Sequence, residues 1–348
     1  MSVSTERITD TTPTRSKPQP SRWRLMPERG TVSLFELALL AACVALIAIP
    51  LPRFYQDIII VTFLWAGVAL AWNLAGGYVG LISFGHAAFF GIGAYTSTIL
   101  LVHHGVTPWI GLWFGGLLAA ALGMTLALIG ARLRGPFFIL STLAAAEIVR
   151  IGALNWTKLT GGAEGIWITP IPSVANMVFT SQTAYAVLVL GYLVVVYVIS
   201  KAIEGSRYGL YLFAVRDDED AASAAGVNPL QARTGAMCLS AFLSAIGGSL
   251  FAQYFQFLDP THVVSPELSF QFALLPALGG LGTAIGPVLG AFAIMPLSEM
   301  LRSYLGAAFQ GLHLAIYGGF IVVVMLYFPS GIAGALQRLA GNRRKGAP

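Results

Sequence analysis

The chain has 348 residues, of which 56% are hydrophobic and only 10% are charged. Soluble domains carry about 25% charged residues, so this composition and a mean hydropathy of +0.76 exclude an ordinary soluble fold. The apolar runs are continuous, which disfavours a β-barrel with its alternating strands of about 10 residues. The composition predicts an all-α membrane protein, a polytopic bundle of transmembrane helices. The net charge of +5 is spread over tails and loops and does not indicate nucleic-acid binding.

About ten segments are candidates for membrane spans, each of which needs about 20 mostly apolar residues. In chain order they are 33–50, 57–75, 83–102, 109–131, 136–154, 184–200, 234–258, 267–283, 285–302 and 311–328. The eighth and ninth are short and are joined by Gly-Leu-Gly-Thr-Ala-Ile-Gly-Pro. They are therefore predicted to be re-entrant or broken helices, which membranes tolerate only where protein or water covers the backbone.

Basic residues predict the orientation of the bundle. If residues 1–32 form a cytoplasmic disordered tail, 33–330 the transmembrane domain and 331–348 a cytoplasmic basic tail, then 16 of the 20 Lys and Arg residues lie on the inner side. The positive-inside rule favours this arrangement, with both termini in the cytoplasm. Residues 1–32 lack the apolar core of a cleaved signal peptide.

The polar interval 201–233 is the longest charged segment with hydrophobic sequence on both sides. It holds five acidic and four basic residues, so it is predicted to lie in water on the inner side of the membrane. Within it, Asp220-Ala221-Ala222 and the stop signals Gly226 and Asn228-Pro229 predict a short helix with a small-residue face. This helix is interpreted either as an ordinary loop helix or as a docking element for another protein.

A glycine-rich stretch, 76–95, is predicted to contain closely packed or bent helix. Its polar residues Ser83 and His86 are candidates for lining a path, because an intramembrane histidine is by default a functional hypothesis. The alternative is that His86 bonds a neighbouring backbone group. No second histidine or carboxylate lies at ligand spacing, so no metal site is predicted.

Two Glu-x-x-Arg pairs, Glu147 with Arg150 and Glu299 with Arg302, each follow a Gly-Pro and are predicted to pair on one helix face near its outer end. They indicate either structural anchoring or ligand contact, and Glu147 joins Ser83 and His86 as a candidate path residue. The similar spacing hints at an internal repeat, which is common in transporters.

No motif for catalysis or nucleotide binding is present in the sequence. There is no G-x-x-x-x-G-K-[ST] loop, no G-x-S-x-G and no H-E-x-x-H, and Cys43 and Cys238 lie far apart. The chain is therefore predicted not to be an enzyme, to have no cofactor and to have no catalytic residues. Any ATP hydrolysis that drives it must occur in another subunit.

Four motifs together resemble one known family. The segments G-Y-V-G-L-I-S-F-G-H-A-A-F-F-G-I-G-A-Y (77–95), E-I-V-R with L-T-G-G-A-E-G-I (147–150, 159–166), S-R-Y-G-L-Y-L-F-A-V-R-D-D-E-D-A-A-S-A-A-G-V-N (206–228) and L-G-G-L-G-T-A-I-G-P-V-L-G-A (278–291) are similar to membrane permeases of branched-chain amino acid ABC importers, LivM type. The resemblance runs from about residue 58 to 328. It implies a bacterial inner-membrane permease with a second homologous permease, two cytoplasmic ATPase subunits and an extracytoplasmic substrate-binding protein as partners.

The resemblance also implies that 206–228 docks into the ATPase. The implied coupling residues are Arg216, Glu219, Asp220, Ala221, Ala222 and Gly226, with Asp220 in the place of the glutamate that such importers usually have. The expected substrate is a branched-chain or other hydrophobic amino acid, with urea or short amides as the alternative. An ion-coupled secondary transporter and a membrane-embedded enzyme are the rival interpretations.

Overall fold

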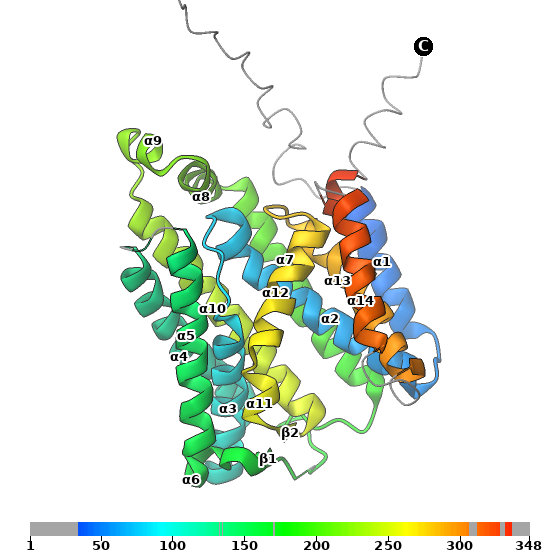
Figure 1. Ribbon diagram of the computed structural model, residues 1–348. Helices are drawn as coiled ribbons and strands as arrows, with labels where there is room; N and C mark the ends of the chain where they lie inside the picture. Colours follow the sequence, from blue (N-terminus) through cyan, green and yellow to red (C-terminus); the bar gives the residue numbers. More distant parts are fainter. Residues whose placement is uncertain are drawn as a thin grey trace, which may run out of the picture.

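The computed structural model describes residues 34–131, 133, 135–169, 171–305, 312–327 and 331–335 (Figure 1). The predicted tail 1–32, most of the predicted basic tail, and the inner-loop residues Arg132 and Arg134 lie outside these residues. The described chain is mostly helical, as the composition predicts.

The helices are α1 Leu34–Ala48, α2 Arg53–Asn73, η2 (a π-helix) Leu74–Tyr78, α3 His86–His104, α4 Pro108–Gly130, α5 Pro136–Asn155, α6 Thr157–Thr160, η3 (a 3₁₀-helix) Gly162–Glu164, α7 Gln182–Gly205, α8 Arg207–Asp217, α9 Glu219–Ala224, α10 Pro229–Phe255, α11 Pro260–Val263, α12 Pro266–Gly279, α13 Ile285–Leu305 and α14 Leu312–Tyr327. Two short strands, β1 Ile166–Trp167 and β2 Phe257–Leu258, pair antiparallel with Ile166 opposite Leu258.

Six helices in the described part of the chain are long and apolar enough to cross a membrane: α2 with η2, α4, α5, α7, α10 and α13. The other four predicted spans coincide with α1, α3, α12 and α14, which are shorter or less apolar, so the count of ten spans is not confirmed. For α3 the cause is local. Gly80 has a φ of +78° and residues 79–85 leave helical geometry, so α3 begins only at His86 and contains three histidines.

The bundle has two distinct ends (Figure 1). One end carries α8 and α9 and is called here the α9 end; the opposite end carries α6, β1 and β2 and is called the α6 end. The helices between them run alternately toward one end and the other. The loop 280–284 lies at the α9 end, where it joins α12 to α13.

Helix α2 is the centre of the bundle. It is buried from Thr62 to Asn73 and contacts α7, α10, α12 and α13, as expected for a helix that is apolar on all sides. Helices α3, α4 and α10 form a second packed group. Its closest contacts depend on glycine: a Cβ on Gly248 of α10 would lie 1.9 Å from the carbonyl oxygen of Phe90 in α3.

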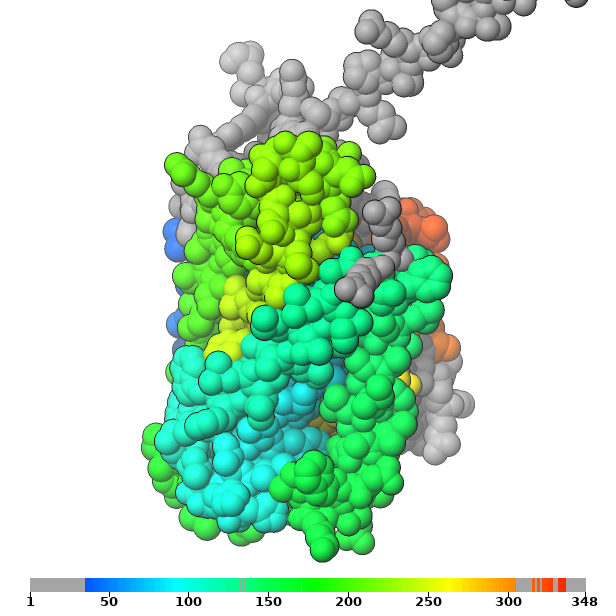
Figure 2. Space-filling model, turned by 90° about the vertical axis from the view of Figure 1, so that its left-hand side faces the viewer, coloured from blue at the N-terminus to red at the C-terminus, as the bar shows by residue number. Residues whose placement is uncertain are grey.

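The outward faces of α4 and α5 are apolar and form much of the surface in Figure 2. On α4 the exposed side chains include Trp113, Phe114, Leu117 and Leu118, and on α5 they include Leu140 and Ile148. Such residues suit hydrocarbon or another apolar surface.

Two stretches of backbone inside the bundle are not helical. In residues 79–85, Trp72 Nε1 donates to the Ser83 carbonyl (2.8 Å) and Thr142 Oγ1 accepts from Phe84 N (3.1 Å). In the loop 280–284, Gly282 N donates to Asn73 Oδ1. Side chains of α2 and α5 therefore replace the hydrogen bonds that a continuous helix would have made.

We expect the α3–α10 contact to tolerate no added methyl group. Gly248→Ala should lower the free energy of unfolding in mixed micelles by about 2 kcal/mol, within the range typical of overpacking, because the added Cβ meets backbone and not a movable side chain. Gly191→Ala in α7, where a Cβ meets nothing within 4 Å, is the matched control and should be neutral or slightly stabilising. Equal effects of the two changes would contradict the close α3–α10 packing.

Candidate functional site

The polar interval 201–233 folds into the end of α7, the two short helices α8 and α9, and the start of α10. Ser206 Oγ caps α8 by accepting from Gly209 N (3.1 Å), and Asp218 Oδ1 caps α9 by accepting from Ala221 N (2.9 Å). Each cap satisfies an amide that the first helical turn leaves free. In Figure 2 these helices, coloured yellow-green, form one end of the molecule.

The predicted short helix is confirmed as α9, Glu219–Ala224. It ends where Gly226 takes a φ of +87°, a conformation that favours glycine. Asn228 Oδ1 then accepts from Gln231 N (3.2 Å) and Pro229 occupies the first turn of α10. The sequence pattern of acidic cap, alanines, glycine and Asn-Pro therefore determines both ends of α9.

The residues predicted to couple this region to an ATPase are not all on the surface. Asp220, Ala221 and Gly226 are exposed. Ala222 is only 4% exposed and packs in the hydrophobic core, so its methyl group seats α9 on its own chain. Glu219 accepts two hydrogen bonds of 2.8 Å from the Arg233 guanidinium, which joins α9 to α10.

Arg216 of α8 also points toward the bundle. Its Nη1 donates to the Gly77 carbonyl of η2 (2.8 Å), its guanidinium carbon lies 5.0 Å from the centre of the Phe213 ring, and its Nε is 3.2 Å from Asp217 Oδ1. Arg216 therefore connects α8 to the end of the central helix.

His86 and Ser83 form a buried polar network between α3, α10 and α2. His86 Nε2 lies 2.8 Å from Ser240 Oγ, and Ser240 Oγ donates to the Ala71 carbonyl (2.6 Å). Because that donation uses the only hydroxyl proton of Ser240, the network assigns the imidazole proton to Nε2. His86 Nδ1 then accepts from Ser83 Oγ (3.2 Å). Both side chains are fully buried, and their predicted place on a path stays a prediction.

A large cavity opens at the α6 end, between α2, α7, α10, α12 and α13. Its volume of about 1930 Å³ exceeds the roughly 300–1,000 Å³ of most small-molecule pockets. It is therefore a wide vestibule and not a closely fitting site.

Charges lie at the mouth of this cavity and apolar groups lie deeper. Arg53 begins α2, whereas Trp65 is twelve residues and so about 18 Å further along the helix axis at 1.5 Å per residue. The remaining charged lining residues are Asp57, Asp259, His262, Glu267, Glu299 and Arg302, and the larger apolar ones include Phe84, Phe251, Phe270 and Leu274. The cavity therefore has charged side chains at its entrance and a largely aromatic surface inside.

Two carboxylates at the mouth are held by neighbours. Asp57 accepts a short hydrogen bond from the Tyr254 hydroxyl, which also contacts Gln182. At Asp259 partial burial raises the pKa, but hydrogen bonds from Thr261 and the nearby His262 outweigh it and hold the pKa below its usual value. Asp259 is thus ionised at neutral pH.

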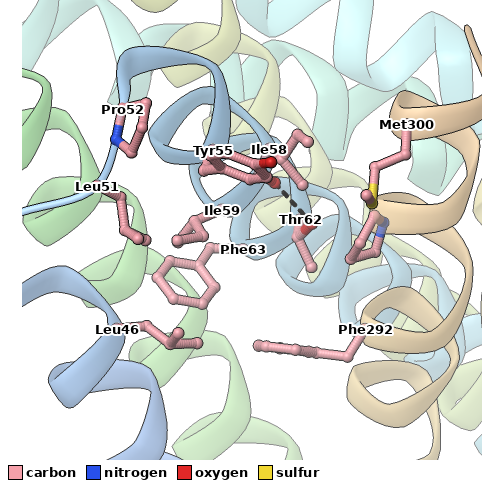
Figure 3. A pocket seen from close by; sticks show the side chains of 11 residues that line it. Leu46, Leu51, Pro52, Tyr55, Ile58, Ile59, Thr62, Phe63, Phe292 and Met300 are labelled. Atoms are coloured by element: carbon pink, nitrogen blue, oxygen red, sulfur yellow. Dashed lines mark hydrogen bonds between the residues drawn. The ribbon is translucent and has the colours of Figure 1, made fainter. Parts of the chain in front are cut away.

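A second, smaller pocket of about 330 Å³ lies between α1, α2 and α13 (Figure 3). Its lining is almost wholly apolar and includes Leu46, Ile59, Phe63, Phe292 and Met300. It lacks charged groups, so it cannot recognise a polar solute in the way that the larger cavity can.

Both predicted Glu-x-x-Arg ion pairs form. Arg150 Nε donates to Glu147 Oε2 (2.9 Å) and Arg302 Nη2 lies 2.9 Å from Glu299 Oε2. The first pair was predicted near the outer end of its helix, and this position needs correction. Glu147 is eight residues from the end of α5, about 12 Å inside the span. Only the second pair lines the large cavity. The side chains of Glu147 and Arg150 are 38% and 26% exposed.

Sequence reasoning missed the charged mouth of the cavity and Asn73. The signal for the mouth was present, since Arg53, Asp57, Glu267, Glu299 and Arg302 lie near the ends of apolar segments. No sequence signal brings them together, because α2 is about 200 residues away from α12 and α13 in the chain. In the described part of the chain, no group of three or more His, Cys, Asp or Glu residues is placed to hold a metal.

The comparisons with known proteins agree with this architecture. The family model for the permease component of branched-chain amino acid transport systems matches residues 54–328. The high-affinity branched-chain amino acid transport system permease protein LivM of Escherichia coli is 30% identical over 330 residues, 87% of this chain and 76% of that protein. LivH of the same organism is 24% identical over 78% of this chain and 91% of its own length.

A more distant relative has a different solute in its name. The nucleoside ABC transporter permease protein NupC of Lactococcus lactis is 26% identical over 195 residues, 50% of this chain and 59% of its own. No solved structure matches the chain significantly.

The fold and the matches define a multi-pass membrane protein of the transport-permease class. The chain belongs to the family of permease components of branched-chain amino acid transport systems.

We expect His86 to be needed for stability. His86→Ala should lower the free energy of unfolding by about 3 kcal/mol, because it creates a cavity and leaves Ser240 and Ser83 without their partner. His103→Ala, at the exposed end of the same helix, is the control and should be neutral in the same micelle unfolding assay. A stable His86→Ala protein that no longer transports would instead assign His86 to the path.

Cysteine labelling should separate the two ends of the bundle. In a Cys43→Ala, Cys238→Ala background, Ser298→Cys in the cavity and Ala224→Cys on α9 should react with a membrane-impermeant maleimide from opposite sides of the membrane. Ser97→Cys, at a fully buried position, should not react from either side. Labelling of the first two positions from the same side would contradict the arrangement of α9 and the cavity at opposite ends.

Proposed function

We propose that this chain is the permease subunit of an ABC importer and forms part of the translocation path for branched-chain or other hydrophobic amino acids. One observation carries the proposal: a charged, helical surface at one end of the bundle stands opposite a wide cavity at the other. We place the α9 end in the cytoplasm and the cavity on the outer side of the inner membrane.

The exposed face of α9 suits a groove on an ATPase subunit. Asp220, Ala221, Ala224 and Ala225 are exposed, and the alanines let the helix approach a partner closely. The inward anchors Ala222 and the Glu219–Arg233 pair hold α9 against the bundle. A helix that is exposed on one side and fixed to the bundle on the other can transmit a partner's movement to the bundle.

The cavity suits a zwitterion with an apolar side chain. Arg53 and Arg302 can attract a carboxylate, and Asp57, Glu267 and Glu299 can attract an ammonium group. The deeper surface of Trp65, Phe251 and Leu274 is apolar. The wide opening supports weak binding within the permease, so that selection falls to an extracytoplasmic binding protein.

Helix α5 is the face that we assign to a second, homologous permease subunit. It buries the smallest share of its span among the six long apolar helices described, yet it carries the half-exposed Glu147–Arg150 pair well inside the span. Exposure of charge to hydrocarbon is costly, so this face requires a protein or aqueous neighbour. On this basis Glu147 lies beside the path between the two permeases.

In the proposed cycle, ATP closes two ATPase subunits bound to α9 and the corresponding helix of the second permease. The cavity then changes from outward-open to inward-open. ATP binding can favour one state only if the ATPase pair holds α9 more tightly in that state.

The substrate is tested by uptake in cells that carry the complete transporter. Competition by leucine, isoleucine and valine, but not by urea or a nucleoside, is the expected result. Competition by urea or acetamide alone would favour the alternative substrate class.

We expect Ala224→Arg to reduce co-purification of the ATPase subunits by at least about tenfold, because a large charged side chain would stand on the exposed docking face. Ala175→Arg, an exposed alanine at the opposite end, is the matched control and should leave co-purification unchanged. Normal ATPase yield with Ala224→Arg would remove α9 as the docking element. Ala222→Arg is a weaker test because Ala222 faces the core.

A further inference from the structure

A buried side chain of the central helix binds two neighbouring residues of the loop 280–284, and Glu204 of α7 bonds the backbone of a third, Ala284. Asn73 Oδ1 accepts from Gly282 N (3.0 Å) and Asn73 Nδ2 donates to the Thr283 carbonyl (3.0 Å). Asn73 is fully buried, and its two bonds use both polar atoms of the amide on neighbouring residues of the loop. The loop therefore has one defined position relative to the end of α2.

Helix α8 reaches the same point. Arg216 donates to the Gly77 carbonyl of η2, and a Cβ on Gly282 would lie 2.5 Å from Arg216 Nη1 and 3.0 Å from the Gly77 carbonyl oxygen. Gly282 also has a φ of +76°. Three segments distant in sequence, α8, η2 and the loop, thus meet without space for a single added methyl group.

The loop joins the two helices that form one wall of the cavity. Helix α12 contributes Glu267, Phe270 and Leu274 to the lining, and α13 contributes Ser298 and Glu299. Helix α12 ends directly before the loop and α13 begins directly after it, so a shift of the loop would tilt both helices. π-Helices are rare and often lie at functional sites. Here η2 lies between α8, which contacts it through Arg216, and the cavity wall formed by α12 and α13.

We propose that Asn73 is the positioning residue that couples movement of α8 and α9 to the cavity wall formed by α12 and α13. This inference rests on the proposed function, since it requires an ATPase that moves α8 and α9. Arg216 carries the movement to η2, and the Asn73 amide carries it from η2 to the loop. Without the amide, α8 and α9 move but the cavity wall does not follow.

The test measures the cavity directly and needs no transported solute. In the purified complex, reconstituted in nanodiscs in the cysteine-free background, Ser298→Cys is labelled with an impermeant maleimide with and without ATP and vanadate. We expect ATP–vanadate to change the labelling rate by about fivefold or more, in the range of typical coupling between sites. Asn73→Leu, which keeps the size but loses both hydrogen bonds, should abolish this change while ATP hydrolysis continues.

Asn73→Asp keeps the acceptor for Gly282 N and should restore part of the change, which a purely structural role would not predict. Ser269→Ala removes a similarly buried hydrogen bond of α12, from Ala87 N to Ser269 Oγ, and should leave the change intact. If ATP–vanadate has no effect even with Asn73 present, the proposed function is wrong and this inference fails with it. If the effect is present and Asn73→Leu retains it in full, only the coupling role of Asn73 is overturned.

Discussion

Backbone that leaves helical geometry inside a membrane bundle must find other hydrogen-bond partners, because hydrocarbon supplies none. The structure meets this constraint at two places, residues 79–85 and the loop 280–284, with side chains of neighbouring helices. Trp72 and Thr142 satisfy the first, and Asn73 satisfies the second. Thr142 and Asn73 come from distant parts of the chain, so these irregular segments hold the bundle together and do not merely interrupt it.

The same constraint separates the two ends of the molecule. At the α9 end, capped short helices carry charged side chains on the surface. At the α6 end, the helices spread apart around a cavity whose charges lie at its mouth. The central helix α2 runs from one end to the other: Arg53 at its start lines the cavity, and η2 at its end receives Arg216. One helix therefore contacts both the cavity and the α9 end.

The family match covers the scaffold and most of the cavity lining together. The matched region includes the glycine-rich stretch, α8, α9 and the loop 280–284, which are the parts that build the scaffold and its joints. The cavity mouth is assembled from residues near helix ends, and Asp57, Glu267, Glu299 and Arg302 lie within the same matched region. This scaffold is similar to permeases named for branched-chain amino acids and, over half the chain, to one named for nucleosides.

By itself the sequence determined the class of protein, most helix positions, and the ends of α9, because these depend on apolar length and on local caps. It also determined that the Glu-x-x-Arg pairs would form, since residues three apart share a helix face. Only the tertiary structure decided that Ala222 and Arg216 point toward the bundle and that His86 lies between Ser83 and Ser240. It also decided that Asn73 binds a loop more than 200 residues away. These contacts depend on which helices become neighbours. In a membrane protein the hydrophobic pattern does not determine the neighbours, because close packing at glycines and hydrogen bonds between buried polar groups do.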